Sequence, residues 1–135
     1  MSKAFVACVE DLFFRSKIDA TARNLNVPVR FVVPEELPAA CAAGDAAAVL
    51  LELSIDGGGL EAVRRLRSTA STREMPIIGF LSHVDRKLAG AAAAAGVTRV
   101  MPRSEFSETL PDLVMDLVAP GTKREIPEEP ELPDE

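Results

Sequence analysis

A glutamate, Glu52, stands where this sequence could do chemistry. It follows residues 48–51, a short apolar run typical of a strand buried in a parallel sheet, and it precedes a loop with three consecutive glycines at residues 57–59. A carboxylate at the carboxyl end of such a strand faces the crevice in which open α/β sheets bind ligands. We therefore predict that Glu52 lies in the functional site.

Other polar residues also follow predicted strands: Glu10, Asp11, Ser82 and Arg103. Because the carboxyl ends of parallel strands meet at one edge of a sheet, these groups should converge with Glu52. The sequence therefore predicts a polar rim of three acids, a hydroxyl and a cation.

Elements with two periodicities alternate along the chain and would position this rim. Continuous apolar or β-branched runs predict strands at residues 4–9, 29–33, 47–53, 76–81 and 98–101. Helical patterns lie between and after them, at residues 11–25, 34–44, 60–69, 85–95 and 104–118. Strict alternation with short loops requires parallel strands joined by right-handed crossovers. We predict a flavodoxin-like (βα)5 fold, a doubly wound parallel five-stranded sheet in three αβα layers with strand order 2-1-3-4-5.

The first predicted helix carries two adjacent phenylalanines. Its register places the following residues on roughly one face: Leu12, Phe13, Ser16, Ala20 and Leu25. We expect Phe13 and Phe14 to be core and helix-packing residues.

This order of elements resembles a response-regulator receiver domain (CheY-like). The resemblance covers residues 3–118, and residues 49–67 are similar to the third strand, loop and third helix of that family. It implies that Glu52 stands at the position of the aspartate that accepts phosphate. It also implies that Glu10 and Asp11 form the acidic pocket that helps to hold Mg²⁺ in receivers.

The resemblance assigns roles to other residues as well. Ser82 and Arg103 stand at the phosphate-contact positions, where receivers have a hydroxyl and a lysine. Val100 is the switch position and replaces the usual aromatic ring. His83 is large enough to cover the path to the site, and the shortened loop has Asp56 where a proline is common. These replacements indicate a restricted site without the usual switch.

Glutamate in place of aspartate acts against phosphotransfer. The extra methylene of Glu52 displaces its carboxylate, and an error of about 1 Å in an attacking group can cost about a hundredfold in rate. Mg²⁺ demands near-octahedral geometry, so the longer side chains of Glu10 and Glu52 disfavour a preformed site. The planar fork of Arg103 fits a carboxylate through two hydrogen bonds. We expect a permanent Glu52–Arg103 pair that imitates the phosphoryl–lysine contact, with no metal and no cofactor.

These features predict a pseudo-receiver: a stand-alone atypical response regulator that acts by protein contact, without phosphotransfer or enzymatic activity. Its partner would be a sensor kinase, another regulator or a second copy of the chain, docking on the first, fourth or fifth helix. The first alternative is an active receiver that accepts phosphate on Glu52 or Asp56. A flavodoxin-type small-ligand binder is a distant alternative, because the rim is acidic and aromatic residues are few.

Simpler interpretations compete with several assignments. Glu10 and Asp11 could cap the first helix, whose dipole favours acids at that end. The glycines at residues 57–59 lack the lysine of a phosphate-binding loop and are better explained as a permissive turn. Ser82 and His83 are too close in sequence for a catalytic triad, whose members come from distant loops.

Composition limits the size of the fold and the class of partner. With 135 residues, of which 47% are hydrophobic and 27% charged, the chain is the size of one domain, placed at residues 1–119. Residues 120–135 contain four prolines and six acids, which predicts a disordered tail. A net charge of −6 and the absence of Trp and Tyr oppose nucleic-acid binding. The sequence shows no membrane span and no signal peptide, so we expect a soluble, cytoplasmic protein.

The two cysteines, Cys8 and Cys41, occupy apolar positions of a strand and a helix. Without CxxC spacing or a histidine cluster, they are predicted to be buried thiols with no chemical role.

Overall fold

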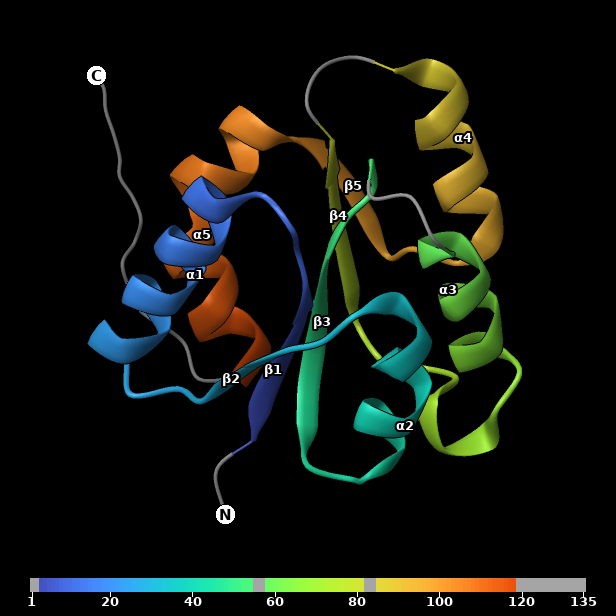
Figure 1. Ribbon diagram of the computed structural model, residues 1–135, viewed down its shortest axis with the longest axis horizontal. Helices are drawn as coiled ribbons and strands as arrows, with labels where there is room; N and C mark the ends of the chain where they lie inside the picture. Colours follow the sequence, from blue (N-terminus) through green and yellow to red (C-terminus); the bar gives the residue numbers. More distant parts are fainter. Residues whose placement is uncertain (1–2, 55–57, 82–84, 119–135) are drawn as a thin grey trace, which may run out of the picture.

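Five parallel strands form a sheet in the computed structural model, which describes residues 3–54, 58–81 and 85–118. Their order is β2-β1-β3-β4-β5 (Figure 1). A helix lies between each strand and the next along the chain, so parallel strands are joined by crossovers. The predicted flavodoxin-like fold and strand order are confirmed.

The elements differ slightly in length from the prediction. The strands are β1 (Ala4–Cys8), β2 (Val29–Phe31), β3 (Ala46–Glu52), β4 (Ile77–Leu81) and β5 (Arg99–Pro102). The helices are α1 (Leu12–Asn24), α2 (Leu37–Ala42), α3 (Gly59–Arg67), α4 (Arg86–Ala95) and α5 (Arg103–Val118). The segment that begins at Pro34 first forms a single 3-10 turn, Pro34–Glu36, so α2 is shorter than predicted. No helix within these described ranges has the length and apolar character needed to cross a membrane.

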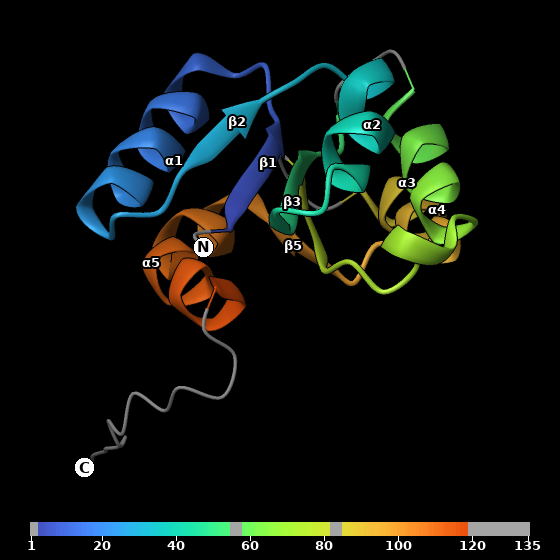
Figure 2. The same ribbon diagram turned by 90° about the horizontal axis from the view of Figure 1, so that it is seen from below.

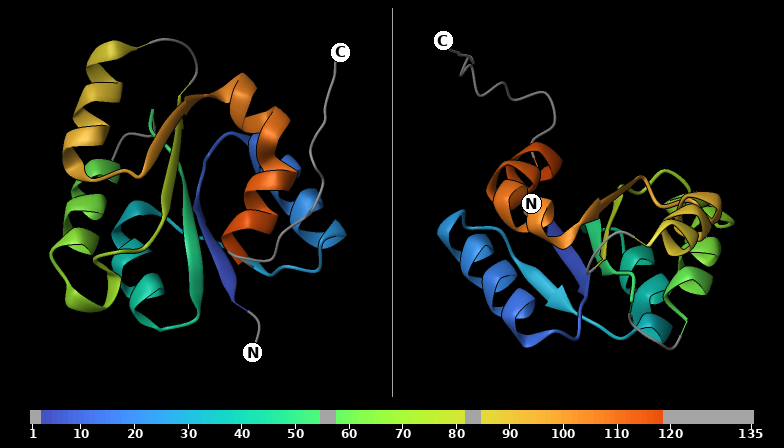
Figure 3. Two further views of the ribbon diagram at one scale, coloured as in Figure 1. Left: turned by 180° about the vertical axis from the view of Figure 1, so that it is seen from behind. Right: turned by 90° about the horizontal axis from the view of Figure 1, so that it is seen from above.

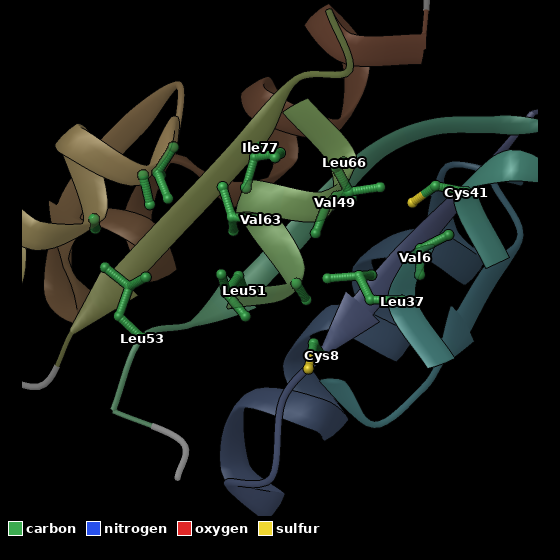
Figure 4. Close-up of a cluster of buried hydrophobic side chains, with 14 of the residues drawn as sticks. Val6, Cys8, Leu37, Cys41, Val49, Leu51, Leu53, Val63, Leu66 and Ile77 are labelled. Atoms are coloured by element: carbon green, nitrogen blue, oxygen red, sulfur yellow. The ribbon is translucent and has the colours of Figure 1, made fainter. Parts of the chain in front are cut away.

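Helices cover both faces of the sheet. α1 and α5 lie on one face, and α2, α3 and α4 lie on the other (Figures 2 and 3). Side chains alternate along β1, with Val6 and Cys8 in the core beneath α2–α4 and Phe5 and Ala7 in the core beneath α1 and α5. Figure 4 shows the first of these cores, in which Leu37 of α2 packs against the sheet. Burial on both faces holds the carboxyl edge of the sheet in place.

The buried face of α1 differs from the predicted one. Phe14, Ile18 and Ala22 are buried, whereas Leu12 and Phe13 are 77% and 65% exposed. The spacing of the buried positions follows the helical repeat. The prediction is correct for Phe14 and wrong for Phe13, because neighbouring residues on a helix point about 100° apart and only one of them can face the sheet.

A glycine in β4 lets the chain after β3 approach the sheet closely. The backbone N–H of Leu53 donates to the carbonyl of Phe80 at 2.9 Å. The Leu53 side chain lies over Gly79, where a Cβ atom would meet three of its carbons at 3.0 Å. Because pairing with β4 continues one residue beyond Glu52, the backbone of Glu52 is held on both sides.

Candidate functional site

The carboxyl ends of β1 and β3 bring three acidic residues to one edge of the sheet. The strands pair in parallel with Cys8 opposite Leu51, so the residues after them leave the sheet together, at its upper edge in Figure 1. Glu52 ends β3, and Glu10 and Asp11 form the turn between β1 and α1. This arrangement follows from the parallel register, as the sequence predicted.

Glu52 is held by the backbone of that turn. Its Oε1 atom accepts hydrogen bonds from the backbone N–H of Glu10 at 2.8 Å and of Asp11 at 3.1 Å. Hydrogen bonds to an ionised carboxylate are about twice as strong as those between neutral groups. The carboxylate also lies near the start of α1, where the helix dipole favours negative charge. The hydrogen bonds of Glu52 therefore link the end of β3 to the start of α1.

The carboxylate of Asp11 caps α1. Its Oδ1 atom accepts hydrogen bonds from the backbone N–H of Phe13 at 2.9 Å and of Phe14 at 3.2 Å. These are donors that have no acceptor within the helix. The capping interpretation is confirmed for Asp11, while Glu10, whose side chain is exposed, contributes its backbone N–H to Glu52.

Arg103 does not pair with Glu52. It is the first residue of α5 and is exposed. The ion pairs within the part of the chain that the structure describes join Arg23 to Asp19, Arg30 to Asp45, Arg64 to Glu61, and Arg99 to Glu105. The predicted Glu52–Arg103 pair, and with it the imitation of a phosphoryl–lysine contact, is therefore wrong. Backbone donors already fixed by the fold satisfy the carboxylate, whereas ordering a long exposed arginine would cost side-chain entropy.

Glu52 and Arg103 nevertheless border one small cavity. Its walls are formed by Asp11, Phe14, Glu52, Ser54, Phe80, Leu81 and Arg103. Its volume is about 10 Å³, which is room for roughly one water molecule. The predicted convergence is confirmed for Asp11, Glu52 and Arg103.

Ser54 and Phe80 were not anticipated at this cavity. For Ser54 the available signal was its position, a hydroxyl two residues after Glu52 at the carboxyl edge of the sheet. Nothing in the sequence marked Phe80, because a phenylalanine within an apolar strand is read as core.

Several predicted site residues cannot be placed in this geometry. Ser82, His83 and Asp56 lie outside the described residues, and their roles stay predictions. Val100 lies in β5, where it is partly buried and packs against the core beneath α2–α4. Its role as the switch position likewise stays a prediction.

Both cysteines lie in the core beneath α2–α4 (Figure 4). Burial raises the pKa of Cys8 to about 12, and the negative charges of Glu10 and Glu52 act in the same direction. Burial also raises the pKa of Cys41 to about 11. A thiol that stays protonated at neutral pH is a poor nucleophile. The prediction that both thiols are buried is confirmed.

Part of the donor capacity of the rim carboxylates is used by the backbone. Asp11 Oδ1 and Glu52 Oε1 each accept two backbone hydrogen bonds. Within residues 3–54, 58–81 and 85–118, no group of three His, Cys, Asp or Glu side chains is placed to hold a metal ion. Mg²⁺ is usually held by one or two carboxylates together with several waters, so the disfavoured metal site stays a prediction.

Solved structures share this arrangement of strands and helices. A response regulator from Hahella chejuensis has a TM-score of 0.78 at 14% identity, covering 91% of this chain and 100% of that one. The receiver domain of a sensor histidine kinase from Pseudomonas aeruginosa, which has a magnesium ion in its active-site cleft, has a TM-score of 0.75 at 16% identity, with coverages of 87% and 98%. The chain has the fold of a receiver domain.

A phosphorylated cyanobacterial phytochrome response regulator shares the receiver fold too. Its TM-score is 0.74 at 14% identity, covering 90% of this chain and 98% of that one. No protein-family model and no curated protein matches the sequence. The resemblance stated from the sequence is thus confirmed at the level of the fold.

Proposed function

We propose that this protein is a signalling module of the response-regulator type that acts through protein contacts and does not accept phosphate, a pseudo-receiver. The receiver fold supports the class of module. The hydrogen bonds from the backbone of Glu10 and Asp11 to Glu52 carry the second part of the proposal. A carboxylate oxygen that accepts two backbone N–H groups is poorly placed to attack a phosphoryl donor.

Phosphorylation of Glu52 would disrupt this arrangement. Each hydrogen bond to a charged group contributes about 1.5–3 kcal/mol. The adjoining cavity of about 10 Å³ has space for roughly one water molecule, so a phosphoryl group would have to displace the Glu52 side chain from the turn. The two N–H groups of Glu10 and Asp11 would then lose their acceptor. These costs favour the unmodified carboxylate.

We further propose that Glu52 is inert and does not mimic the phosphorylated state. A mimic would need to engage the cation after β5, and Glu52 instead binds the turn after β1. The β1–α1 turn is thereby held in one conformation. The module would signal by binding its partner, and a kinase would not change the conformation of its surface.

The proposed partners are a sensor kinase, another regulator or a second copy of the chain. Contacts would be made by the surfaces of α1, α4 or α5. The outward residues of these helices are available for binding, because their opposite faces are buried in the two cores.

Treatment with acetyl phosphate and Mg²⁺, followed by intact mass spectrometry, tests this proposal. The unchanged protein should gain no phosphate, while an active receiver treated in parallel should become labelled. The Glu52→Asp variant is the comparison: labelling of this variant alone would show that the length of Glu52, which lets it reach the turn, prevents phosphorylation.

The same experiment also tests the alternative, in which the protein is an active receiver. One observation favours that alternative: structures of the same fold include a phosphorylated regulator and a receiver with a magnesium ion in its cleft. Stoichiometric phosphate retained on Glu52 or Asp56 would establish it and overturn the pseudo-receiver.

A further inference from the structure

The helix α4 packs against the sheet through small side chains. Its buried residues are Ala92 and Ala95, whereas Leu88 and Ala89 are only partly buried. By contrast, α5 buries four large residues: Phe106, Leu110, Leu113 and Val114. A methyl group buries little apolar area and does not interlock with its neighbours, so side-chain packing restrains α4 weakly.

The first turns of α4 leave space beside β5. A hollow of about 160 Å³ lies there, and its walls include Arg86 and Ala89 of α4 and Val100 of β5. Gly90, in the middle of the helix, has nothing within 4 Å of the position of a Cβ atom, and glycine weakens a helix relative to alanine. The start and the middle of α4 are therefore held less closely than its end.

A single arginine holds the end of α4. Arg67 is the last residue of α3, and its Nε atom donates to the backbone carbonyl of Gly96 at 2.9 Å. Gly96 caps the end of α4 and has φ +117. A Cβ atom at Gly96 would meet Cγ of Arg67 at 2.7 Å, so the arginine side chain lies closely against this turn. Because α3 and α4 are neighbours in the same layer (Figures 1 and 2), the contact joins the ends of two adjacent helices.

The other nitrogens of the Arg67 guanidinium reach two more segments. Nη1 donates to the carbonyl of Arg73 at 2.8 Å and to that of Thr72 at 3.5 Å, in the loop before β4. Nη2 donates to Oγ1 of Thr98 at 3.1 Å, just before β5. That oxygen also accepts a hydrogen bond from the backbone N–H of Ile77 at 2.9 Å, at the start of β4. Arg67 thereby joins α3, the end of α4 and the amino ends of β4 and β5.

Neutral oxygens surround the charge of Arg67. Among the ion pairs of the described residues, none includes Arg67. Burial lowers the pKa of its guanidinium, although the negative charge of Glu74 acts in the opposite direction. An arginine nevertheless stays charged in a protein, and hydrogen bonds from a charged donor are about twice as strong as those between neutral groups. These bonds therefore restrain the three segments more than neutral donors would.

We propose that Arg67 is a positioning residue that fixes α4 on the sheet, and that α4 loosens as a separate unit when this contact is removed. Glu52 restrains the β1–α1 turn at the carboxyl edge of the sheet, and Arg67 restrains α4 from the amino edge. Each of these charged side chains binds the backbone and has no charged partner. Because α4 is one of the contact surfaces proposed above, Arg67 would also set how that surface is presented, and only this last consequence rests on the proposed function.

Native-state hydrogen exchange of the full chain, followed by NMR at single amides, tests the proposal. In the unchanged protein the amides of α4 should exchange faster than those of β1 and β3, because α4 opens without unfolding of the whole domain. Arg67→Met removes the donors and keeps an apolar side chain. It should speed up exchange in α4 and at residues 96–98 at least about tenfold, since one hydrogen bond to a charged group shifts an equilibrium by about that factor.

Two variants are controls for a purely global effect. Arg65→Met removes an exposed arginine from the same helix and should leave exchange in α4 unchanged. Glu52→Ala destabilises the fold at the other edge of the sheet, and it too should leave α4 unchanged, because opening of α4 does not break the hydrogen bonds of Glu52. The proposal would be overturned if α4 exchanged as slowly as the central strands, or if Arg67→Met and Glu52→Ala accelerated it equally.

A double-mutant cycle tests the fit between Arg67 and Gly96. Gly96→Ala alone places a methyl group against the arginine side chain and should lower the Tm. In an Arg67→Ala background the obstructing atoms are absent, so the same substitution should lower the Tm by less. Equal shifts in the two backgrounds would show that the residues do not act together, which also contradicts the proposal. None of these results bears on phosphate labelling, so the proposed function is tested separately.

Discussion

Replacing Glu52 with three different residues separates the roles of length and charge in this side chain. The structure shows its Oε1 atom accepting hydrogen bonds from the backbone N–H of Glu10 at 2.8 Å and of Asp11 at 3.1 Å. Glu52→Ala removes the acceptor, Glu52→Gln keeps its length without the charge, and Glu52→Asp keeps the charge but shortens the side chain. If the bonds to the turn matter, length should count for more than charge.

The expected magnitudes follow from the two hydrogen bonds. A bond to a charged group contributes about 1.5–3 kcal/mol and a neutral one about 0.5–1.5 kcal/mol. The bond from Glu10 is exposed and the one from Asp11 is only partly buried, so water replaces part of what is lost. We expect Glu52→Ala to lower the free energy of unfolding by about 1–3 kcal/mol, and Glu52→Gln by about half as much. Glu52→Asp should resemble the alanine variant, because its carboxylate falls short of the turn.

Urea unfolding followed by far-UV circular dichroism measures this series, since the chain has no Trp or Tyr for fluorescence. Hydrogen exchange at the backbone amides of Glu10 and Asp11 should speed up in the same order as stability falls. Glu108→Ala, which removes an exposed glutamate from α5, is the control and should change stability by less than about 0.5 kcal/mol. An alanine variant as stable as the unchanged protein, or an aspartate variant more stable than the glutamine one, would refute the reasoning.

Two further predictions concern stability. Gly90→Ala in α4 should raise the free energy of unfolding by about 0.5–1 kcal/mol, because nothing lies within 4 Å of the added carbon. Gly96→Ala should lower the free energy of unfolding by about 1–2 kcal/mol, because Gly96 has φ +117 and the added carbon would meet Arg67 at 2.7 Å. Thermal unfolding compares the two, and equal shifts would contradict the prediction. The raised pKa of Cys8, from 9.0 to about 12, means that the folded protein keeps a proton that the unfolded chain loses. The protonated Cys8 thiol therefore contributes to the free energy of unfolding. This contribution is fully present below pH 9.0 and is lost as the pH rises toward 12, with a slope of up to about 1.4 kcal/mol per pH unit. Cys8→Ala should flatten that slope, and an unchanged slope would show that Cys8 is not its cause.

Much of the fold could be predicted because it follows from the local periodicity of apolar residues. Alternating apolar runs and helical patterns predicted five strands, five helices and a parallel sheet in the observed order. The buried face of α1 was predicted incorrectly, because Phe13 and Phe14 are equally apolar and composition does not choose between them. Packing chose Phe14, whose ring contacts Phe80 and Phe106 in the core beneath α1 and α5.

The site divides in a similar way. The convergence of Asp11, Glu52 and Arg103 followed from their positions after parallel strands, and the structure places all three around one cavity. The partner of Glu52 did not follow. An ion pair can be guessed from side-chain types, whereas a bond to the main chain leaves no mark in the sequence, because almost every residue has a backbone N–H.

The sequence alone determined the alternation of strands and helices, the placement of a glutamate at the carboxyl end of β3, and the burial of the two cysteines. These depend on periodicity and on side-chain polarity, which are local properties of the chain. Only the tertiary structure decided which groups Glu52 binds, which phenylalanine enters the core, and that Leu12 and Phe13 are exposed. Those outcomes depend on the directions of backbone donors and helix faces, which are set when β1 and β3, about 40 residues apart along the chain, are brought side by side.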